Sequence, residues 1–431
     1  MAKLIVKNFS CIKHAELDIA NFTIIIGEQA SGKSLLSKLV YFSQRIPPNL
    51  EGLFEAEKTI KDLENDIIDN FLLWFPCGAW GAKTFSIYFE IGKFSLKIER
   101  PSVAKSKNEK IKIYFSQVFL DEYDKFLKYI KEENEKYSKI ENKKGADIGY
   151  GLEPFYRIWR SEGAKFREKL DINRIHQTFV PAGRAYFTSI GRIVGFFEEI
   201  GSVDPITAGF GRLYAFLSDT KGVRFFPSRT RKLENVNSYH LNFEKRILRG
   251  EIKIEKDKRY ILSDDGRKVP LAIASSGQQE VIPLLQVLGY TAEVKNRTFL
   301  FIEEPEAHLF PTAQSELIEY ISSFVTDEKN SSKMFITTHS PYILAQVNNF
   351  IKAGILSQES NDATKKKIEK IIPKEAWLKY GYVIAYTIKD GVLESIMDAE
   401  TGLINAEAID GVSEVISEQF SKLLDIEFPD V

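Results

Sequence analysis

One short segment, residues 27–34, constrains the fold of this chain more than any other. It reads GEQASGKS and matches the pattern GxxxxGK[ST] at every fixed position. The isoleucine-rich run at residues 22–26 precedes it, as expected of a strand buried on both faces of a sheet. A predicted helix over residues 33–44 follows. Strand, glycine-bounded loop and helix in this order predict a phosphate-binding loop in an α/β protein.

The residues of this loop are expected to bind the phosphates of a nucleotide. Glycines let the backbone N–H groups point at phosphate oxygens, and the N-terminus of the following helix adds positive potential. Lys33 should reach the β- and γ-phosphates, and Ser34 should ligate Mg²⁺. A chance glycine-rich turn is the alternative. The predicted binding residues of the loop are Gly27, Glu28, Gln29, Ala30, Ser31, Gly32, Lys33 and Ser34.

A second feature is the acidic end of a predicted strand. The segment TFLFIEEPEAHLFP, residues 298–311, begins as an apolar strand and reaches two glutamates, Glu303 and Glu304. Adjacent carboxylates at the end of a buried strand are costly unless a cation or a water network meets them. We therefore expect Glu303 to hold Mg²⁺, directly or through water, and Glu304 to position and polarise an attacking water. A solvated loop is the alternative.

A third feature is a small-residue turn that runs into a helix. Within LAIASSGQQEVIPLL, residues 271–285, Ser275, Ser276 and Gly277 open a predicted helix. The N–H groups and hydroxyls at such an N-terminus form a second anion site. Because it is separate from the phosphate loop in sequence, we expect it to serve the γ-phosphate on a partner subunit. An ordinary serine N-cap is the alternative.

A fourth feature is a histidine at the end of another apolar strand. The segment MFITTHSPYIL, residues 334–344, brings His339 to the strand end about 35 residues after the acidic pair. An imidazole in that position is expected to hydrogen-bond the γ-phosphate or the attacking water. A histidine with a purely structural role is the alternative.

The order of these four features resembles that of ABC-type ATPases, and in detail that of the RecF, SMC and OLD branch. ASSGQQE resembles the LSGGQ-type signature, with Ser275 at the serine, Gly277 at the second glycine and Gln278 at the final polar position. IEEPEAHLFP resembles the OLD-type acidic motif, and TTHSPYIL resembles its switch-histidine strand. FVPAGR resembles a VPAxR-type segment of OLD-like ATPases, which implies that Arg184 faces the nucleotide or the dimer interface. A surface arginine in a salt bridge is the alternative.

This resemblance implies an ATPase that converts ATP and water to ADP and phosphate with Mg²⁺. ATP would bind between the phosphate loop of one subunit and the signature of another. Two ATP molecules would thus bridge a head-to-head dimer, or a larger even-numbered assembly. The implied catalytic residues are Glu304, His339 and Lys33, the implied metal ligands are Ser34 and Glu303, and the nucleotide-binding set gains Ser275, Ser276, Gly277, Gln278 and Arg184.

The sequence departs from the family pattern in places. Glu303 stands where the family has an aspartate, and Ser276 replaces the first signature glycine. The D-loop aspartate has no clear counterpart. Three residues are candidates for the Q-loop glutamine: Gln44, Gln117 and Gln177.

The resemblance also implies the architecture. It predicts a mixed α/β head with a phosphate-loop core and an antiparallel β subdomain, an inserted helical arm and a small C-terminal α/β segment. The predicted parts are residues 1–115 and 177–350 for the two halves of the head, 116–176 for the arm and 351–431 for the accessory segment. Within these parts we expect a helix over 53–74, a hairpin over 84–99 that turns at Gly92, and one or two exposed helices over 118–170.

Composition and charge bear on the binding partners and the cellular location of the protein. The formal net charge of −1 gives no global electrostatic argument for nucleic acid or membrane binding, and no apolar run approaches the roughly 20 residues that span a bilayer. The N-terminal residues do not resemble a signal peptide. Cys11 and Cys77 belong to no metal-spaced cluster, and a disulfide is not expected. We therefore expect a cytoplasmic protein.

The sequence does not identify the process that this ATPase would control. The residues after His339 show no TOPRIM pattern, so we expect no built-in nuclease. Stand-alone heads of this kind resemble ATPase subunits of antiphage systems of the Septu and PARIS kind, which implies a switch that regulates a separate effector such as a nuclease or toxin. The alternative is a DNA-repair or DNA-tethering ATPase of the RecF or SMC type, with residues 221–260, where 12 Lys/Arg face 5 Asp/Glu, as the DNA surface. A transporter subunit fits poorly.

Overall fold

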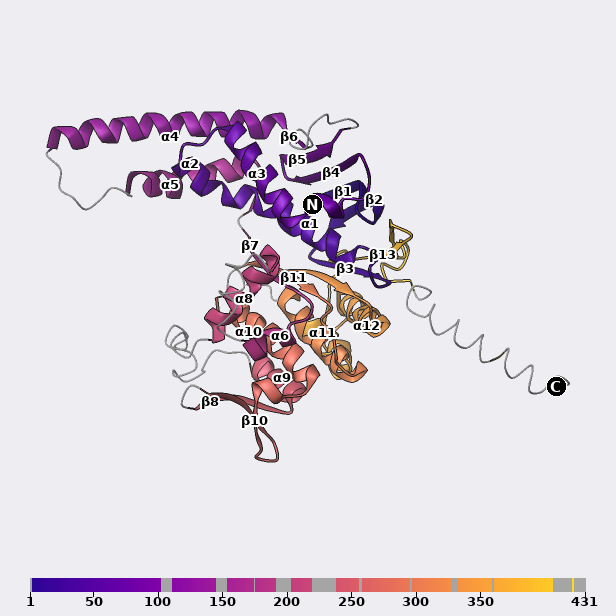
Figure 1. The fold of residues 1–431 in the computed structure, drawn as a ribbon. Coiled ribbons are helices and arrows are strands. Elements are labelled where there is room, and N and C mark those ends of the chain that lie inside the picture. The colour runs from indigo at the N-terminus through magenta and orange to yellow at the C-terminus, as the bar shows by residue number, and fades with distance from the viewer. Residues whose placement is uncertain are drawn as a thin grey trace. The chain divides into compact units, whose positions relative to one another are not determined.

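The computed structural model describes residues 2–101, 111–144, 153–173, 175–190, 203–218, 238–255, 258–294, 297–326, 332–358, 360–405 and 421. The chain forms two units (Figure 1). The first comprises Met1–Ala20, Ala30–Gln177 and Ile388–Leu393, and the second comprises Asn21–Gln29, Thr178–Thr387 and Glu394–Val431.

The first unit is built on antiparallel strands. In the order β6-β5-β4-β1-β2 each strand pairs antiparallel with its neighbour. Gly92 forms the predicted turn of the β4–β5 hairpin with φ 57°, a value that favours glycine. The prediction of an antiparallel section is confirmed. The strands are β1 (Ala2–Phe9), β2 (Ile12–Ile19), β4 (Phe85–Ile91), β5 (Phe94–Arg100) and β6 (Lys112–Phe115).

The helices that follow the phosphate loop in this unit differ from the prediction at one place. The prediction of a single helix over residues 53–74 is wrong, because the helix is interrupted at residues 56–59, where Glu57 has φ 49°. Thr59 then starts a new helix: Asp62 Oδ2 accepts from the Thr59 N–H at 2.8 Å, and Thr59 Oγ1 accepts from the Asp62 N–H at 3.3 Å. The helices are α1 (Lys33–Arg45), α2 (Glu51–Glu55) and α3 (Ile60–Trp74), with 3₁₀ turns at Pro47–Leu50 and Cys77–Ala79.

Two long helices, α4 (Gln117–Lys144) and α5 (Glu153–Lys169), form the predicted insertion. Figure 1 shows them side by side. Aromatic side chains of both helices pack around Phe54 of α2, whose ring centroid lies 4.5 Å from Tyr123 and 5.4 Å from Phe166. The insertion is thus anchored by burial of large apolar rings at its base, in agreement with the apolar positions at helical spacing.

The second unit contains a parallel core. Its strands follow the order β13-β3-β12-β11-β7, and β12 pairs in parallel with both β3 and β11. Every residue of β11 is buried, as expected of a central strand covered on both faces. The strands are β3 (Phe22–Gly27), β11 (Thr298–Glu303), β12 (Lys333–Thr338) and most of β7 (His176–Val180) and β13 (Val383–Lys389). The residues of β14 (Val392–Ser395) are divided between the two units.

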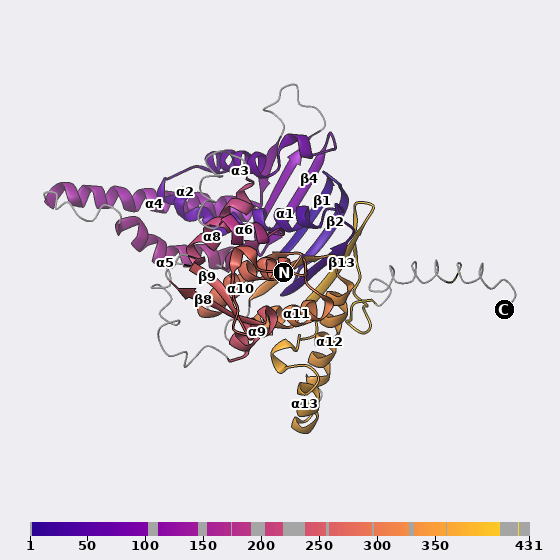
Figure 2. The ribbon, with the colours of Figure 1, turned by 60° about the horizontal axis from the view of Figure 1, so that its bottom comes forward.

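Helices and a small second sheet complete this unit. Figure 2 shows α11 beside α12 and α13 beyond it. The helices are α6 (Ala185–Ile190), α8 (Pro205–Ser218), α9 (Ser238–Leu248), α10 (Ser276–Val294), α11 (Pro311–Thr326), α12 (Pro341–Gln358) and α13 (Asp362–Glu369), with 3₁₀ turns at Leu271–Ile273 and Lys374–Ala376. The antiparallel sheet has the order β10-β9-β8, from β8 (Gly250–Glu255), β9 (Lys258–Ser263) and β10 (Lys268–Pro270).

The mixed α/β fold predicted from the sequence is confirmed, including its phosphate-loop strand, antiparallel section, inserted helices and C-terminal α/β segment. Within the described ranges, no helix combines the length and the apolar character needed to cross a membrane.

A close backbone contact at Gly354 gives a stability prediction. A Cβ on Gly354 of α12 would lie 1.9 Å from the main-chain oxygen of Leu378, and a main-chain atom cannot rotate away as a side chain can. We expect Gly354→Ala to lower the free energy of unfolding by about 1–3 kcal/mol in denaturant titrations.

The matched control is Gly289→Ala in α10, because a Cβ there meets nothing within 4 Å. It should be neutral or stabilise by up to about 1 kcal/mol. Equal stability of Gly354→Ala and the native chain would contradict the contact.

Candidate functional site

The carboxyl ends of three parallel strands meet at one edge of the second unit. Glu303 at the end of β11 is in register with Thr337 of β12, and Thr337 is in register with Ile25 of β3. The residues that follow in the three strands are therefore Glu304, the pair Thr338–His339, and Ile26 with the start of the phosphate loop at Gly27. Ligand sites of open α/β sheets form outside the carboxyl ends of such strands.

The phosphate loop has the local geometry that its sequence predicts. Gly32 precedes α1 with φ 108°, and a Cβ on it would lie 2.4 Å from Ile12 Cδ1 and 2.9 Å from Cys11 Sγ. The positive φ favours glycine, and any larger residue here would require the side chains of Ile12 and Cys11 to move. Among the residues that the structure describes, no side chain caps the start of α1. The N–H groups of its first turn are thus suited to an anion, and Lys33 is buried at that end, with 4% of its surface exposed.

The two glutamates of the acidic motif lie in different environments. Glu303 is 5% exposed, and its Oε2 accepts from the N–H of Ala182 at 3.3 Å. Glu304 is more exposed and has φ 44°, and its N–H donates to the Thr337 carbonyl at 2.8 Å. The left-handed backbone at Glu304 turns the chain sharply, so that consecutive carboxylates leave the strand in different directions.

His339 faces the second of these carboxylates. Its Nε2 lies 3.3 Å from Glu304 Oε1, and both side chains are about one-third exposed. An imidazole and a carboxylate at this separation, accessible from solvent, have the chemistry to orient a water molecule and accept its proton. The structure thus brings Glu304 and His339 within contact of each other.

Glu306 is a residue that the sequence reasoning missed. It is 9% exposed, and its Oε1 accepts from the Thr338 hydroxyl at 2.8 Å and from the His339 N–H at 2.7 Å. Its Oε2 is buried and has no hydrogen-bond partner within the described part of the chain. Glu306 thereby fixes the backbone of His339. The signal in the sequence was a third acid in EEPE, close to the end of the buried strand.

Burial raises the pKa of the Glu306 carboxyl above its ordinary value, against the hydrogen bonds from His339 and Thr338, which lower it. Because folding raises this pKa, ionisation of Glu306 disfavours the folded state, and stability falls as the pH rises above the unfolded value. We expect Glu306→Gln, which retains an acceptor oxygen, to melt at a higher temperature than the native chain at pH 8, with a difference that shrinks towards pH 5.

The control for this pH comparison is Glu168→Gln on α5, where the native glutamate is exposed. It should show no such trend. A lower melting temperature of Glu306→Gln at pH 8, constant with pH, would mean that the ionised carboxylate supports the fold.

The predicted signature opens α10 as an exposed helix start. Ser275 and Gln278 cap each other: Gln278 Oε1 accepts from the Ser275 N–H at 3.1 Å, and Ser275 Oγ accepts from the Gln278 N–H at 3.3 Å. Ser276 is exposed. A Cβ on Gly277 would lie 2.8 Å from the His308 carbonyl, so this helix start packs against the turn after the acidic strand. Ser275 is thus an N-cap of α10, as the alternative states. The first turn of α10 is also accessible to solvent.

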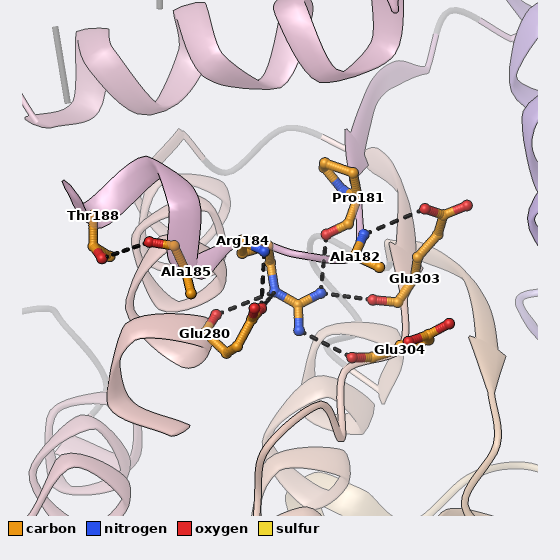
Figure 3. A network of polar contacts seen from close by, with 8 residues as sticks. All are labelled: Pro181, Ala182, Arg184, Ala185, Thr188, Glu280, Glu303 and Glu304. Atoms are coloured by element: carbon orange, nitrogen blue, oxygen red, sulfur yellow. Dashed lines mark hydrogen bonds and ion pairs between the residues drawn. The ribbon is translucent and has the colours of Figure 1, made fainter. Parts of the chain in front are cut away.

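Arg184 requires a correction. The resemblance placed it against the nucleotide or the dimer interface, but the side chain is fully buried. Its guanidinium donates to main-chain carbonyls of Pro181, Glu280, Glu303 and Glu304, as Figure 3 shows. Its donors are thus engaged within its own chain, and no nucleotide contact is retained for it. The alternative of a surface arginine in a salt bridge is correct about the salt bridge, because Glu280 Oε2 lies 3.5 Å from Arg184 Nε. It is wrong about the surface, because both side chains are buried.

The residues present fit nucleotide phosphates and Mg²⁺. Mg²⁺ keeps several water ligands and takes only one or two protein oxygens in addition to phosphate oxygens. Ser34 carries a hydroxyl and Glu303 a carboxylate, which are oxygen donors of the kind that Mg²⁺ prefers. Within the described ranges there is no group of three or more His, Cys, Asp or Glu that could hold a metal by itself.

The glutamine of the Q-loop is not assigned. Gln44 is buried in α1, and its main-chain carbonyl accepts from Gln177 Nε2 at 3.0 Å. Gln117 is exposed at the start of α4 and donates to Asp121 at 2.8 Å.

Comparison with known proteins gives one family match. A family model described as an AAA ATPase domain matches residues 223–344. This stretch holds the signature, both glutamates and His339, whereas the phosphate loop and Arg184 lie before it. Among curated proteins, no sequence matches this chain.

Several solved structures are similar at low identity. An Smc head domain with an extended coiled coil, bound to the C-terminal domain of ScpA and derived from Pyrococcus furiosus, is 12% identical, covers 97% of this chain and 100% of that chain, and has a TM-score of 0.40. The SMC head domain from Thermotoga maritima is 12% identical over 91% of this chain and 97% of that chain, with a TM-score of 0.34. The recombination mediator protein RecF-ATPrS in the RecFOR pathway is 11% identical over 91% and 97%, with a TM-score of 0.35.

At TM-scores of this size, the likeness carries no information about the site. The AAA match and the order of the four motifs support an ATP-binding ATPase domain.

Proposed function

We propose that this protein binds ATP at residues 27–34 and hydrolyses it to ADP and phosphate. The observation that carries the proposal is the 3.3 Å contact between Glu304 Oε1 and His339 Nε2, at the edge where β3 enters the phosphate loop. Lys33 binds the β- and γ-phosphates, and Ser34 and Glu303 hold Mg²⁺, which neutralises charge on those phosphates.

The reaction is an in-line displacement. Glu304 orients a water molecule and accepts its proton, with His339 as hydrogen-bond partner of the water or the γ-phosphate. The water oxygen bonds to the γ-phosphorus while the bond to the β–γ bridging oxygen breaks, so that ADP and inorganic phosphate leave. Positioning and charge stabilisation supply most of the rate in this class of reaction.

A second copy of the chain completes the site in this proposal. Ser275, Ser276, Gly277 and Gln278 of one subunit bind the γ-phosphate of the ATP held by the other, so that two ATP molecules hold a head-to-head dimer. The exposed, capped start of α10 supports this role, because helix N-termini bind anions. Hydrolysis then releases the two heads from each other.

The dimer acts as a switch for a separate effector, such as a nuclease or toxin in antiphage defence. The resemblance to stand-alone ATPase subunits of such systems supports this role. The helices α4 and α5 and the segment 351–431 are the proposed partner surfaces.

The described residues do not favour the alternative role, which is DNA binding. In the basic stretch 221–260, Lys245 and Lys253 both pair with Glu251, and Arg246 lies 3.9 Å from Glu319. Residues 221–237, 256 and 257 of this stretch lie outside the described residues. A salt-sensitive stimulation of ATP hydrolysis by DNA would favour DNA binding over control of a separate effector.

The experiment compares ATP binding and phosphate release by the native chain, Lys33→Ala and Lys61→Ala. Lys61 is an exposed lysine of α3, outside the loop. We expect the native chain and Lys61→Ala to bind and hydrolyse ATP equally, and Lys33→Ala to do neither. ATP hydrolysis unaffected by Lys33→Ala would refute the assigned site.

A further inference from the structure

We propose that Arg184 is a positioning residue. It joins the first turns of α10, the helix that begins with the signature, to the backbone of Glu303 and Glu304. The inference rests on the proposed function for its effect on hydrolysis, and on the geometry of Figure 3 for the connection itself. Arg184 thereby acts through Glu304 and does not touch the nucleotide.

On one side, the guanidinium holds the end of β11. Nη1 donates to the Glu303 carbonyl at 2.6 Å, and Nη2 donates to the Glu304 carbonyl at 3.0 Å. These bonds flank the left-handed turn at Glu304, whose φ is 44°. A non-glycine residue keeps such a conformation only where its surroundings fix it, so Arg184 sets the direction in which the Glu304 carboxylate leaves the strand.

On the other side, the same residue holds α10. Nε donates to the Glu280 carbonyl at 3.1 Å, and the main-chain N–H of Arg184 donates to Glu280 Oε2 at 2.9 Å. Glu280 lies one helical turn after Ser276, in the turn that follows the signature. The two segments also touch at Gly277 and the His308 carbonyl. The signature start and the catalytic turn are thus connected at two points.

Burial makes this connection specific. The Arg184 and Glu280 side chains are 0% and 4% exposed, and burying such a pair is costly unless every donor and acceptor is satisfied. A salt bridge to Glu280 alone would neutralise the charge. The planar fork of arginine additionally reaches several carbonyls at once, which the single ammonium of lysine cannot do.

The test measures kcat, the Kd for ATP and the melting temperature of Arg184→Lys and Glu280→Gln. Glu280→Gln keeps an acceptor for the Arg184 N–H, and it serves if Arg184→Lys does not fold. The control is Arg246→Lys, the same exchange at a half-exposed arginine of α9. We expect kcat per folded molecule to fall about 10- to 100-fold in Arg184→Lys and less in Glu280→Gln, while the Kd for ATP changes less than about threefold.

A second readout separates positioning from general destabilisation. In the Glu304→Gln background, Arg184→Lys should change the residual rate by less than about twofold, because the group it positions is already gone. Hydrogen exchange of segments 276–282 and 303–309 should rise together in Arg184→Lys, with or without ATPase activity, and exchange of α4 should not.

The outcomes are distinguishable from those of the proposed function. An inactive native chain refutes the ATPase proposal, while hydrogen exchange still tests the connection. Unchanged kcat in both folded variants, or a loss of ATP affinity as large as the loss of kcat, overturns the positioning role. Exchange that rises in only one of the two segments overturns the connection.

Discussion

Replacing Glu304 with glutamine should leave ATP binding unchanged and slow hydrolysis by about 100-fold or more. Glutamine has nearly the same shape, but its amide cannot accept the proton of the attacking water. The 3.3 Å contact with His339 Nε2 places Glu304 where such a proton transfer is needed. Phosphate release under saturating ATP gives the rate, and binding of labelled ATP gives the affinity.

The matched control is Glu168→Gln, which removes one exposed carboxylate of α5 far along the sequence. It should keep the native rate. If Glu304→Gln hydrolyses ATP at the native rate, the catalytic carboxylate has been assigned to the wrong residue, and Glu303 becomes the next candidate.

Gly32→Ala should weaken ATP binding by about 10- to 100-fold. The backbone of Gly32 has φ 108°, which strains any other residue by about 1–3 kcal/mol, and every 1.4 kcal/mol is a factor of ten in affinity. The new methyl group would also lie 2.4 Å from Ile12 Cδ1 and 2.9 Å from Cys11 Sγ, so that these side chains must move. The Kd for ATP and the melting temperature measure the two effects.

Gly52→Ala in α2 is the control for this exchange, because its Cβ meets nothing within 4 Å. Its affinity for ATP should equal that of the native chain. Full ATP affinity in Gly32→Ala would mean that the loop binds phosphate in another conformation, or that ATP binds elsewhere.

The features predicted correctly from the sequence are those encoded within a short window. The apolar runs before Gly27, Glu303 and His339 are β3, β11 and β12, because a strand buried on both faces is almost continuously apolar. The turn at Gly92 and the helices of the insertion follow local periodicity and turn chemistry in the same way. The contact between Glu304 and His339 was not predicted as such, because it depends on the parallel pairing of β11 with β12.

The features that were missed depend on partners distant in sequence. Arg184 contacts residues about 96 and 120 positions away, and nothing in FVPAGR distinguishes a buried arginine from one that faces a ligand. The role of Glu306 depends on Thr338 and His339, 32 and 33 positions later. The break at residues 56–59 was locally encoded by Thr59 and Asp62, but the apolar spacing on both sides hid it.

The mass of Glu304→Gln in solution, with and without ATP and Mg²⁺, tests the central claim most directly. One chain has a mass of 49.3 kDa. The account predicts a single chain without nucleotide and a particle of twice that mass, or a larger even multiple, with ATP, since hydrolysis no longer separates the heads. A mass of one chain at saturating ATP would contradict the head-to-head switch.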